Sequence, residues 1–296
     1  MDVGQARADI RRILARAGML DAAFEVDQIF CSETGMSRAA LHAHPEIIMD
    51  AEVFSRITGL AARRALGEPL AYVLESARFC GREFSPRETL IPRPETEVLT
   101  NLACDLLKRI GTSGGYFADW CTGSGCIAIT LLLENPGWRC LAVDSSSDAL
   151  RTARANAASH GVLDRMTTLL CDTPEKSGVD PESLDIVIAN PPYIPTQDIE
   201  TLENQVRDFE PLNALDGGMD GLDTYRTLLR WLPRLLKPGG CFFAETGGEE
   251  QANDVISLGR VIWGARSEIG GINFVEKLSD HRGISRFILW QKPPVN

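Results

Sequence analysis

The chain has 296 residues, of which 44% are hydrophobic, and this is enough apolar material for a folded core in one or two domains. A formal net charge of −11 argues against nucleic acid as the main ligand, because nucleic-acid-binding surfaces are usually basic. The eight cysteines form no C-x-x-C pair, which is typical of a reducing cytosol and not of a zinc site. The longest nearly apolar run, 126–133, is too short to span a bilayer. We therefore expect a cytoplasmic protein that binds no membrane and no metal.

The first part of the chain has the pattern of a small helical bundle. Apolar residues recur at helical spacing in residues 3–18. Three further apolar segments are each preceded by a suitable N-cap residue, namely Asp21, Ser37 and Asp50. The last segment ends before Gly67. Four helices here predict a helical domain over residues 1–70.

Residues 71–94 change to short extended runs that are broken by Gly and Pro. Residues 71–74 and 78–84 are compatible with the two arms of a β-hairpin, with Cys80 and Gly81 near its bend. We expect this segment to link two domains.

Strands and helices alternate over residues 95–296, which we take as the second domain. The predicted strands are 116–120, 140–143, 167–170, 184–189, 241–245, 273–275 and 285–290. The predicted helices are 95–110, 125–134, 146–160, 221–236 and 249–259. This alternation predicts an α/β domain with a mainly parallel, doubly wound sheet of seven strands, whose last two strands can pair as an antiparallel edge.

A glycine-rich turn, Cys121 to Gly125, follows the first of these strands and leads into an apolar helix. Such a turn lets a ligand approach the backbone at the switch point of an open sheet, although a purely structural turn explains it equally well. The next strand ends at Asp144, whose carboxylate can accept hydrogen bonds from both ribose hydroxyls of a nucleoside. The third glycine of the dinucleotide fingerprint is absent, which favours an adenosine-bearing ligand without a diphosphate, such as S-adenosylmethionine. Asp172 ends the following strand, where an adenine edge would lie.

The tetrapeptide Asn190-Pro191-Pro192-Tyr193 follows the fourth predicted strand. The two prolines fix the backbone and remove two N–H donors, so that nearby carbonyls can point into a site. An amide or aromatic amino nitrogen is a poor nucleophile because its lone pair is delocalised. The Asn190 side-chain oxygen and the Pro191 carbonyl can accept its two N–H bonds, and Tyr193 can stack against the planar group. The alternative interpretation is a proline-stiffened turn with an ordinary buried tyrosine.

The glycine turn and Asp144 together resemble the class I S-adenosylmethionine-dependent methyltransferases, over residues 95–296. That family usually has glycine where this chain has Cys121, and we expect the cysteine to keep an ordinary backbone conformation there. Within the family, the sequence follows the pattern of the release-factor glutamine N5-methyltransferases in the stretches 67–72 (GEPLAY), 90–97 (LIPRPETE), 207–215 (RDFEPLNAL), 217–222 (GGMDGL), 237–240 (KPGG) and 245–247 (ETG).

This resemblance implies a Rossmann-like methyltransferase domain, preceded by a helical domain that docks the substrate. The substrate would be the glutamine of the Gly-Gly-Gln motif in class 1 peptide chain release factors, with S-adenosyl-L-homocysteine as the second product. We also expect a monomer, and the acidic charge leads us to expect no direct nucleic-acid contact. The residues that would hold the glutamine are Asn190, Pro191, Pro192 and Tyr193. The residues that would hold the cofactor are Cys121, Thr122, Gly123, Ser124, Gly125, Asp144, Asp172, Thr173 and Asn190.

Three alternatives stay open at this point. Adenine N6-methyltransferases of nucleic acids share the tetrapeptide, but the segment 194–220 is short and acidic here, without a basic channel. A sister group methylates a glutamine of a ribosomal protein. The cysteine at position 121 also prompts a non-catalytic cofactor binder. Arg93 and Glu95 either line the substrate entrance or, with Pro94, only start a helix.

Overall fold

The computed structural model describes residues 1–111, 114–264 and 272–294. The chain divides into two compact units. We call the first the helical unit, which comprises Met1–Ser76 and Glu203–Phe209. We call the second the sheet unit, which comprises Ala77–Leu202 and Glu210–Asn296. No helix within the described ranges is long and apolar enough to cross a membrane.

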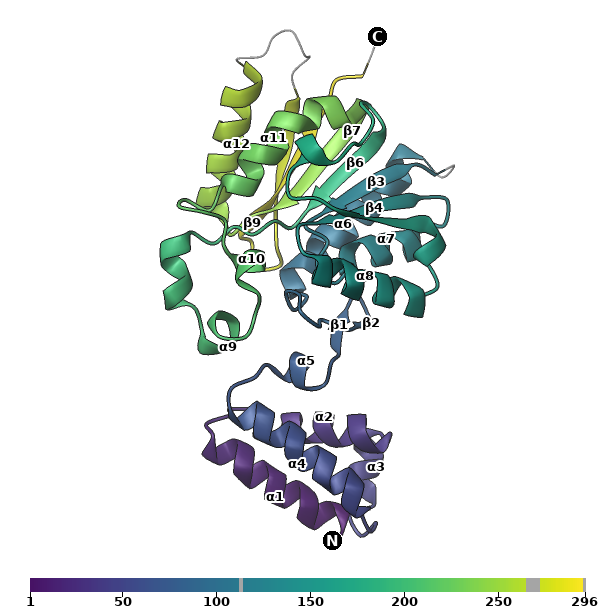
Figure 1. The fold of residues 1–296 in the computed structure, drawn as a ribbon, viewed down its shortest axis with the longest axis vertical. Helices are drawn as coiled ribbons and strands as arrows, with labels where there is room; N and C mark the ends of the chain where they lie inside the picture. Colours follow the sequence, from purple (N-terminus) through teal and green to yellow (C-terminus); the bar gives the residue numbers. More distant parts are fainter. Residues whose placement is uncertain (112–113, 265–271, 295–296) are drawn as a thin grey trace. The chain divides into compact units, whose positions relative to one another are not determined.

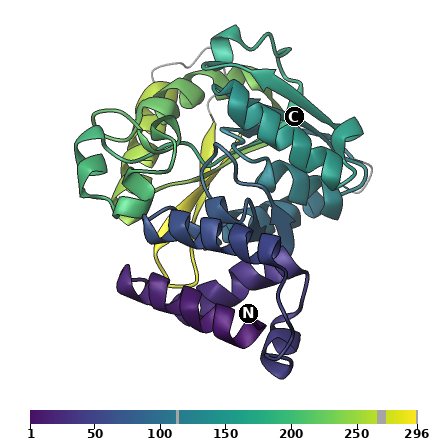
Figure 2. The same ribbon diagram turned by 60° about the horizontal axis from the view of Figure 1, so that its bottom comes forward.

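The helical unit confirms the predicted N-terminal helical region. Its four main helices pack side by side (Figures 1 and 2) and are α1 (Val3–Arg16), α2 (Ala22–Thr34), α3 (Arg38–Ala43) and α4 (Ala51–Ala65). The side chains of Ser37 and Asp50 cap α3 and α4 as expected, whereas Asp21 precedes α2 without a side-chain cap bond. Two one-turn helices, α5 (Leu70–Val73) and α9 (Asn204–Arg207), complete the unit.

The predicted hairpin was wrong in its first arm. Residues Leu70–Val73 form α5, and both arms come from the second predicted run, as β1 (Ala77–Phe79) and β2 (Arg82–Phe84). The reason is local: Cys80 and Gly81 have positive φ values of 47° and 75°. Positive φ at both central residues makes a tight two-residue hairpin turn, so β2 pairs directly with β1.

The sheet unit contains the predicted seven-stranded sheet. Its strands are β3 (Tyr116–Trp120), β4 (Arg139–Asp144), β5 (Met166–Leu170), β6 (Leu184–Ala189), β7 (Leu236–Glu245), β8 (Asn273–Ser279) and β9 (Ser285–Gln291). The spatial order is β5-β4-β3-β6-β7-β9-β8. The first five of these strands are parallel, and β9 pairs antiparallel with both β7 and β8, which confirms the antiparallel edge.

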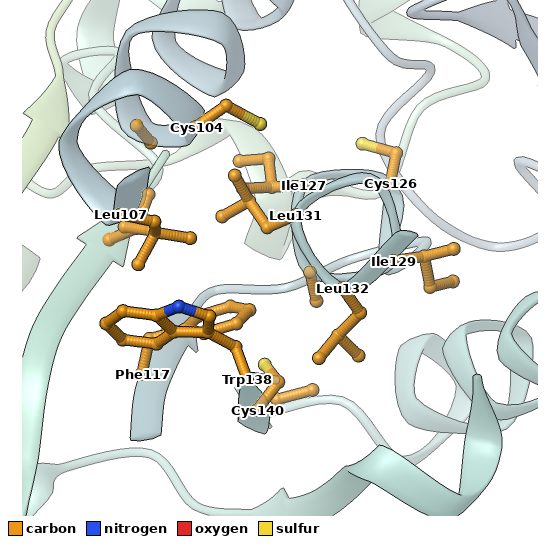
Figure 3. Packing of buried hydrophobic residues seen from close by; sticks show 14 of the residues in the cluster. Cys104, Leu107, Phe117, Cys126, Ile127, Ile129, Leu131, Leu132, Trp138 and Cys140 are labelled. Atoms are coloured by element: carbon orange, nitrogen blue, oxygen red, sulfur yellow. The ribbon is translucent and has the colours of Figure 1, made fainter. Parts of the chain in front are cut away.

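Helices cover both faces of this sheet (Figure 1). The helices α6 (Pro94–Ile110), α7 (Cys126–Glu134) and α8 (Ser147–Ser159) pack on one face. The helices α11 (Asp223–Leu235) and α12 (Glu249–Gly264) pack on the other. Alternate strand residues therefore enter two different cores: Phe117 packs under α7, and Ala118 packs toward α11. Figure 3 shows the first core, where α6 and α7 meet the sheet through Cys104, Leu107, Ile127, Leu131, Phe117, Trp138 and Cys140.

A buried carboxylate ties three elements of the helical unit together. Asp27 on α2 has only 2% of its side-chain surface exposed and is paired with Arg7, Arg38 and His42. Burial raises the pKa of Asp27, but the hydrogen bonds from His42, Arg7 and Arg38 outweigh it and hold the pKa below its usual value of 3.8. The ionised form therefore stabilises the folded unit above that pH, and this contribution is lost as the pH falls through the folded-state pKa.

We predict that Asp27→Asn lowers the free energy of unfolding by about 3 kcal/mol at neutral pH, because Arg7 then keeps its charge without a buried partner. Chemical denaturation followed by circular dichroism measures the loss, which should shrink as the pH drops below about 4. Asp9→Asn is the matched control, since Asp9 pairs with Arg12 at the surface and should cost less than about 1 kcal/mol. Equal losses in both variants would contradict the prediction.

Candidate functional site

The ends of three parallel strands lie level at one edge of the sheet. Trp120, the last residue of β3, is in register with Val143 of β4 and with Ala189 of β6. The chain runs from β3 outward to β4 and β5 and then returns to β6 on the other side of β3. The gap between these two directions is a topological switch point, where open α/β sheets bind their ligands.

A cavity opens at this edge and lies wholly within the sheet unit. Together with its open mouth, it contains about 940 Å³ of empty space. The expected site residues that line it are Cys121, Thr122, Gly123, Ser124, Asp144, Asp172, Asn190 and Pro192. Four other expected residues do not line it in the part of the chain that the structure describes, namely Gly125, Pro191, Tyr193 and Thr173.

These four residues lie next to segments that line the cavity. Gly125 is the N-cap of α7, where an added Cβ would lie 3.1 Å from the Cβ of Ala153 on α8. Pro191 is buried, and Tyr193 lines a separate surface pocket with Gln251. Thr173 is half-buried after β5, and its Oγ1 is buried without a hydrogen-bond partner.

The expectation of an ordinary backbone at Cys121 was wrong. Its φ is 64°, in the left-handed region, alongside 54° at Gly123 and 78° at Gly125. The next residue, Thr122, is held from two sides: its N–H donates to Val143 O at 3.0 Å and its hydroxyl to Asp119 Oδ2 at 2.7 Å. Both bonds fix the chain after β3, so residue 121 must supply the left-handed turn whichever side chain it carries.

The Cys121 side chain borders the cavity as a protonated thiol. Burial raises its pKa well above the usual value of 9.0, and the nearby carboxyls of Asp144 and Asp119 raise it further. A thiolate is therefore not formed near neutral pH, and the group acts as a small apolar side chain.

The Asp144 carboxylate is fixed by backbone groups. One oxygen accepts the Gly123 N–H at 2.9 Å, and the other accepts the Ser146 N–H at 2.9 Å. Burial raises the pKa of Asp144, while the hydrogen bonds from Gly123, Ser146 and Ser145 oppose that rise. A carboxylate has about four acceptor sites in all, so Asp144 keeps acceptor capacity for a ligand beside these backbone bonds.

The Asn190–Tyr193 loop is held by side chains that lie far away in the sequence. The Asn190 side-chain amide donates to Thr96 Oγ1 at 3.0 Å. The Gln251 side chain donates to Tyr193 O at 2.8 Å and to Gly221 O at 3.2 Å, and it accepts from Gly247 N–H at 2.7 Å. Sequence analysis did not identify Gln251, because nothing local marks a glutamine on α12 that bridges three loops.

A buried ion pair ties two walls of the cavity together. Glu210, whose side chain is 1% exposed, pairs with Arg93 and accepts the Ile91 N–H at 3.2 Å. Arg93 also lines the cavity, while Pro94 and Glu95 form the first turn of α6. Arg93 thus belongs to the site, and its two neighbours carry the helix-start signals.

We predict that Cys121 tolerates glycine but not a β-branched residue. Cys121→Gly should stay within about 1 kcal/mol of the native free energy of unfolding, whereas Cys121→Val should lose about 2 kcal/mol or more, because valine resists positive φ. Thermal or chemical unfolding gives both values. Cys31→Val, a half-buried helical position, is the control and should lose less than about 1 kcal/mol. A Cys121→Val protein as stable as the glycine variant would rule out the left-handed turn.

The family model described as PrmC N-terminal domain matches residues 5–74, and the one described as Methyltransferase small domain matches residues 99–207. The release factor glutamine methyltransferase of Geobacter sulfurreducens is 37% identical over 238 residues, which are 80% of this chain and 81% of that protein. The one of Nitratidesulfovibrio vulgaris is 36% identical over 295 residues, which are 95% and 94% of the two chains. A crystal structure of a protein-(glutamine-N5) methyltransferase (release factor-specific) from Alicyclobacillus acidocaldarius is 30% identical, covers 69% of this chain and 96% of its own, and has a TM-score of 0.40. With relatives this similar over most of its length, the chain belongs to the release factor glutamine methyltransferase family.

Proposed function

We propose that this protein transfers a methyl group from S-adenosylmethionine to the side-chain amide nitrogen (N5) of the glutamine in the Gly-Gly-Gln motif of class 1 peptide chain release factors. One observation carries the proposal. Asn190 borders the cavity directly after β6, and its amide nitrogen is already engaged by Thr96. Its side-chain oxygen is left as an acceptor for the N–H of a planar amide.

The residues at the cavity fit S-adenosylmethionine. The backbone from Cys121 to Gly125 offers close approach without bulky side chains, and the fixed Asp144 carboxylate keeps acceptor capacity for a ribose hydroxyl. Asp172 and Thr173 follow β5, where the adenine edge would lie, and Asp172 lines the cavity. When bound, this cofactor supplies an electrophilic methyl group on its sulfonium sulfur.

The chain's own contribution to the reaction is orientation. Asn190 Oδ1 and the Pro191 carbonyl would accept the two N–H bonds of the glutamine amide, which turns the face of its nitrogen lone pair toward the methyl group. Pro192 borders the cavity, so its ring would flank the planar amide, whereas Tyr193 lines a separate pocket and is not assigned that role. Transfer would break the carbon–sulfur bond, form the carbon–nitrogen bond and release S-adenosyl-L-homocysteine, and the acidic proton of the alkylated nitrogen would pass to solvent. No dedicated base is needed before the attack.

The function is tested by transfer of radiolabelled methyl from S-adenosylmethionine to purified, unmethylated release factor. Parallel acceptors are a release factor with the loop Gln→Ala change, a ribosomal-protein preparation and duplex DNA. We expect label on the unmodified release factor alone. Label on DNA alone would establish an adenine methyltransferase instead, and label on the ribosomal protein alone would establish the sister activity. Cofactor binding without label on any acceptor would favour a non-catalytic binder.

We predict that Asn190→Ala lowers kcat by about 100- to 1000-fold, because it removes one acceptor that orients the reacting amide. The dissociation constant for S-adenosylmethionine, measured by calorimetry, should change far less than kcat. Asn213→Ala is the control. Asn213 also lines the cavity, but it lies in the short helix Leu212–Leu215 and not in the loop after β6. Near-native kcat in the Asn190 variant would remove the role that we assign to this side chain.

A further inference from the structure

The Asn190 amide stands at the end of a buried chain of polar groups. Its Nδ2 donates to Thr96 Oγ1 at 3.0 Å. Thr96 is 3% exposed, lies in the first two turns of α6 and lines the cavity. The carboxyl group of Glu245, the last residue of β7, is 1% exposed, and Thr96 opposes the rise that burial causes in its pKa.

The donor and the acceptor of each hydrogen bond in this series follow from the protons that each group carries. In its ionised form the Glu245 carboxyl group has no proton to give, so a hydrogen bond between the two groups requires the Thr96 hydroxyl to donate. The same hydroxyl can then only accept from Asn190, which must present its NH₂ group to Thr96. Asn190 Oδ1 is thereby directed away from Thr96, toward the amide that is to be methylated.

We propose that Thr96 and Glu245 are positioning residues that fix the orientation of the Asn190 side-chain amide for methyl transfer. The inference rests on the function proposed above, and it gives a role to Thr96 in the 90–97 stretch and to Glu245 in the 245–247 stretch. Without this chain, the two ends of the Asn190 amide, which have the same shape, could exchange by a half-turn. A flipped amide would direct NH₂ at the substrate N–H groups, which is repulsive.

The surroundings of Glu245 make the protonation state of its carboxyl group sensitive to pH. Its Oε2 is buried without a hydrogen-bond partner. Burial raises the pKa of Glu245 to about 7, and the hydrogen bond from Thr96 opposes that rise. The backbone carbonyl of Glu245 accepts the Tyr225 hydroxyl, which holds the end of β7 in place. The titratable and charged groups that act on its carboxyl are Glu95 and Arg93 beside α6, Arg286 on β9, Tyr193 and Tyr225.

When Glu245 is protonated, the donor and acceptor roles in this series of hydrogen bonds are no longer fixed. A protonated carboxyl can donate to Thr96 Oγ1, and the Thr96 hydroxyl is then free to donate to a flipped Asn190 oxygen. Since Glu245 loses its proton as the pH rises through about 7, kcat should rise through the same range. Saturating cofactor excludes effects on cofactor binding from Asp119, whose pKa is also raised to about 7 by burial.

The first experiment is a matched set of variants in α6, assayed with release factor and saturating cofactor. Thr96→Val keeps the shape but removes the hydroxyl, and we expect kcat to fall by about 10- to 100-fold with little change in KM. Thr96→Ser restores the hydroxyl and should recover most of kcat. Thr100→Val is the control, because the equally buried Thr100 hydroxyl bonds only to the Thr96 backbone carbonyl.

The second experiment compares the pH dependence of kcat in the native protein and in Glu245→Gln. The glutamine side chain keeps an acceptor oxygen but does not titrate, so the variant should stay active and lose the rise near pH 7. An unchanged rise in Glu245→Gln, or native kcat in Thr96→Val, would overturn the proposal. If the native protein itself fails to methylate release factor, the proposed function fails; if it methylates release factor and the variants match it, only the positioning chain fails.

Discussion

The register of three parallel strands is the constraint on which the site depends. Hydrogen bonds between β3, β4 and β6 place Trp120, Val143 and Ala189 side by side. Each strand is followed at once by a polar or glycine-containing segment, so the glycine turn, Asp144 and Asn190 meet at one edge without any further device. A slip of one residue in β6 would reverse its faces and remove Asn190 from the cavity. The alternating burial in two separate cores therefore protects the site as well as the sheet.

This dependence explains which features the sequence alone could predict. Apolar runs bounded by turn residues marked the central parallel strands, because a buried parallel strand is nearly continuous in apolar residues. The residues that follow those strands could be assigned to one edge for the same reason. The helix ends at Ser37, Asp50 and Pro94 were also predictable, since capping depends on neighbours within one turn.

The features that were missed depend on contacts between distant residues or on backbone angles. The left-handed turn at Cys121 is imposed by Val143 and Asp119 through Thr122, against the preference of a cysteine. Gln251 and Glu210 bridge loops that lie 30 to 119 residues away, and no local pattern marks such a bridge. The short helix α5 replaced a predicted hairpin arm because the Cys80–Gly81 turn had already supplied β2 with its partner.

Buried polar atoms without a hydrogen-bond partner are concentrated near the site. Within the described residues, five buried side-chain polar atoms have no hydrogen-bond partner, and three of them, on Asp119, Thr173 and Glu245, lie at the carboxyl edge of the sheet. Such atoms destabilise a folded protein, so they are rare in a core that serves packing alone.

Burial raises the pKa of Asp119 and of Glu245 to about 7, so a small change in the environment of either carboxyl group alters its charge. Asp119 holds the glycine turn through Thr122, and on our proposal Glu245 orients Asn190 through Thr96. If the proposed function holds, the cofactor half and the amide half of the site are each oriented by a buried carboxyl group that acts through a neighbouring threonine.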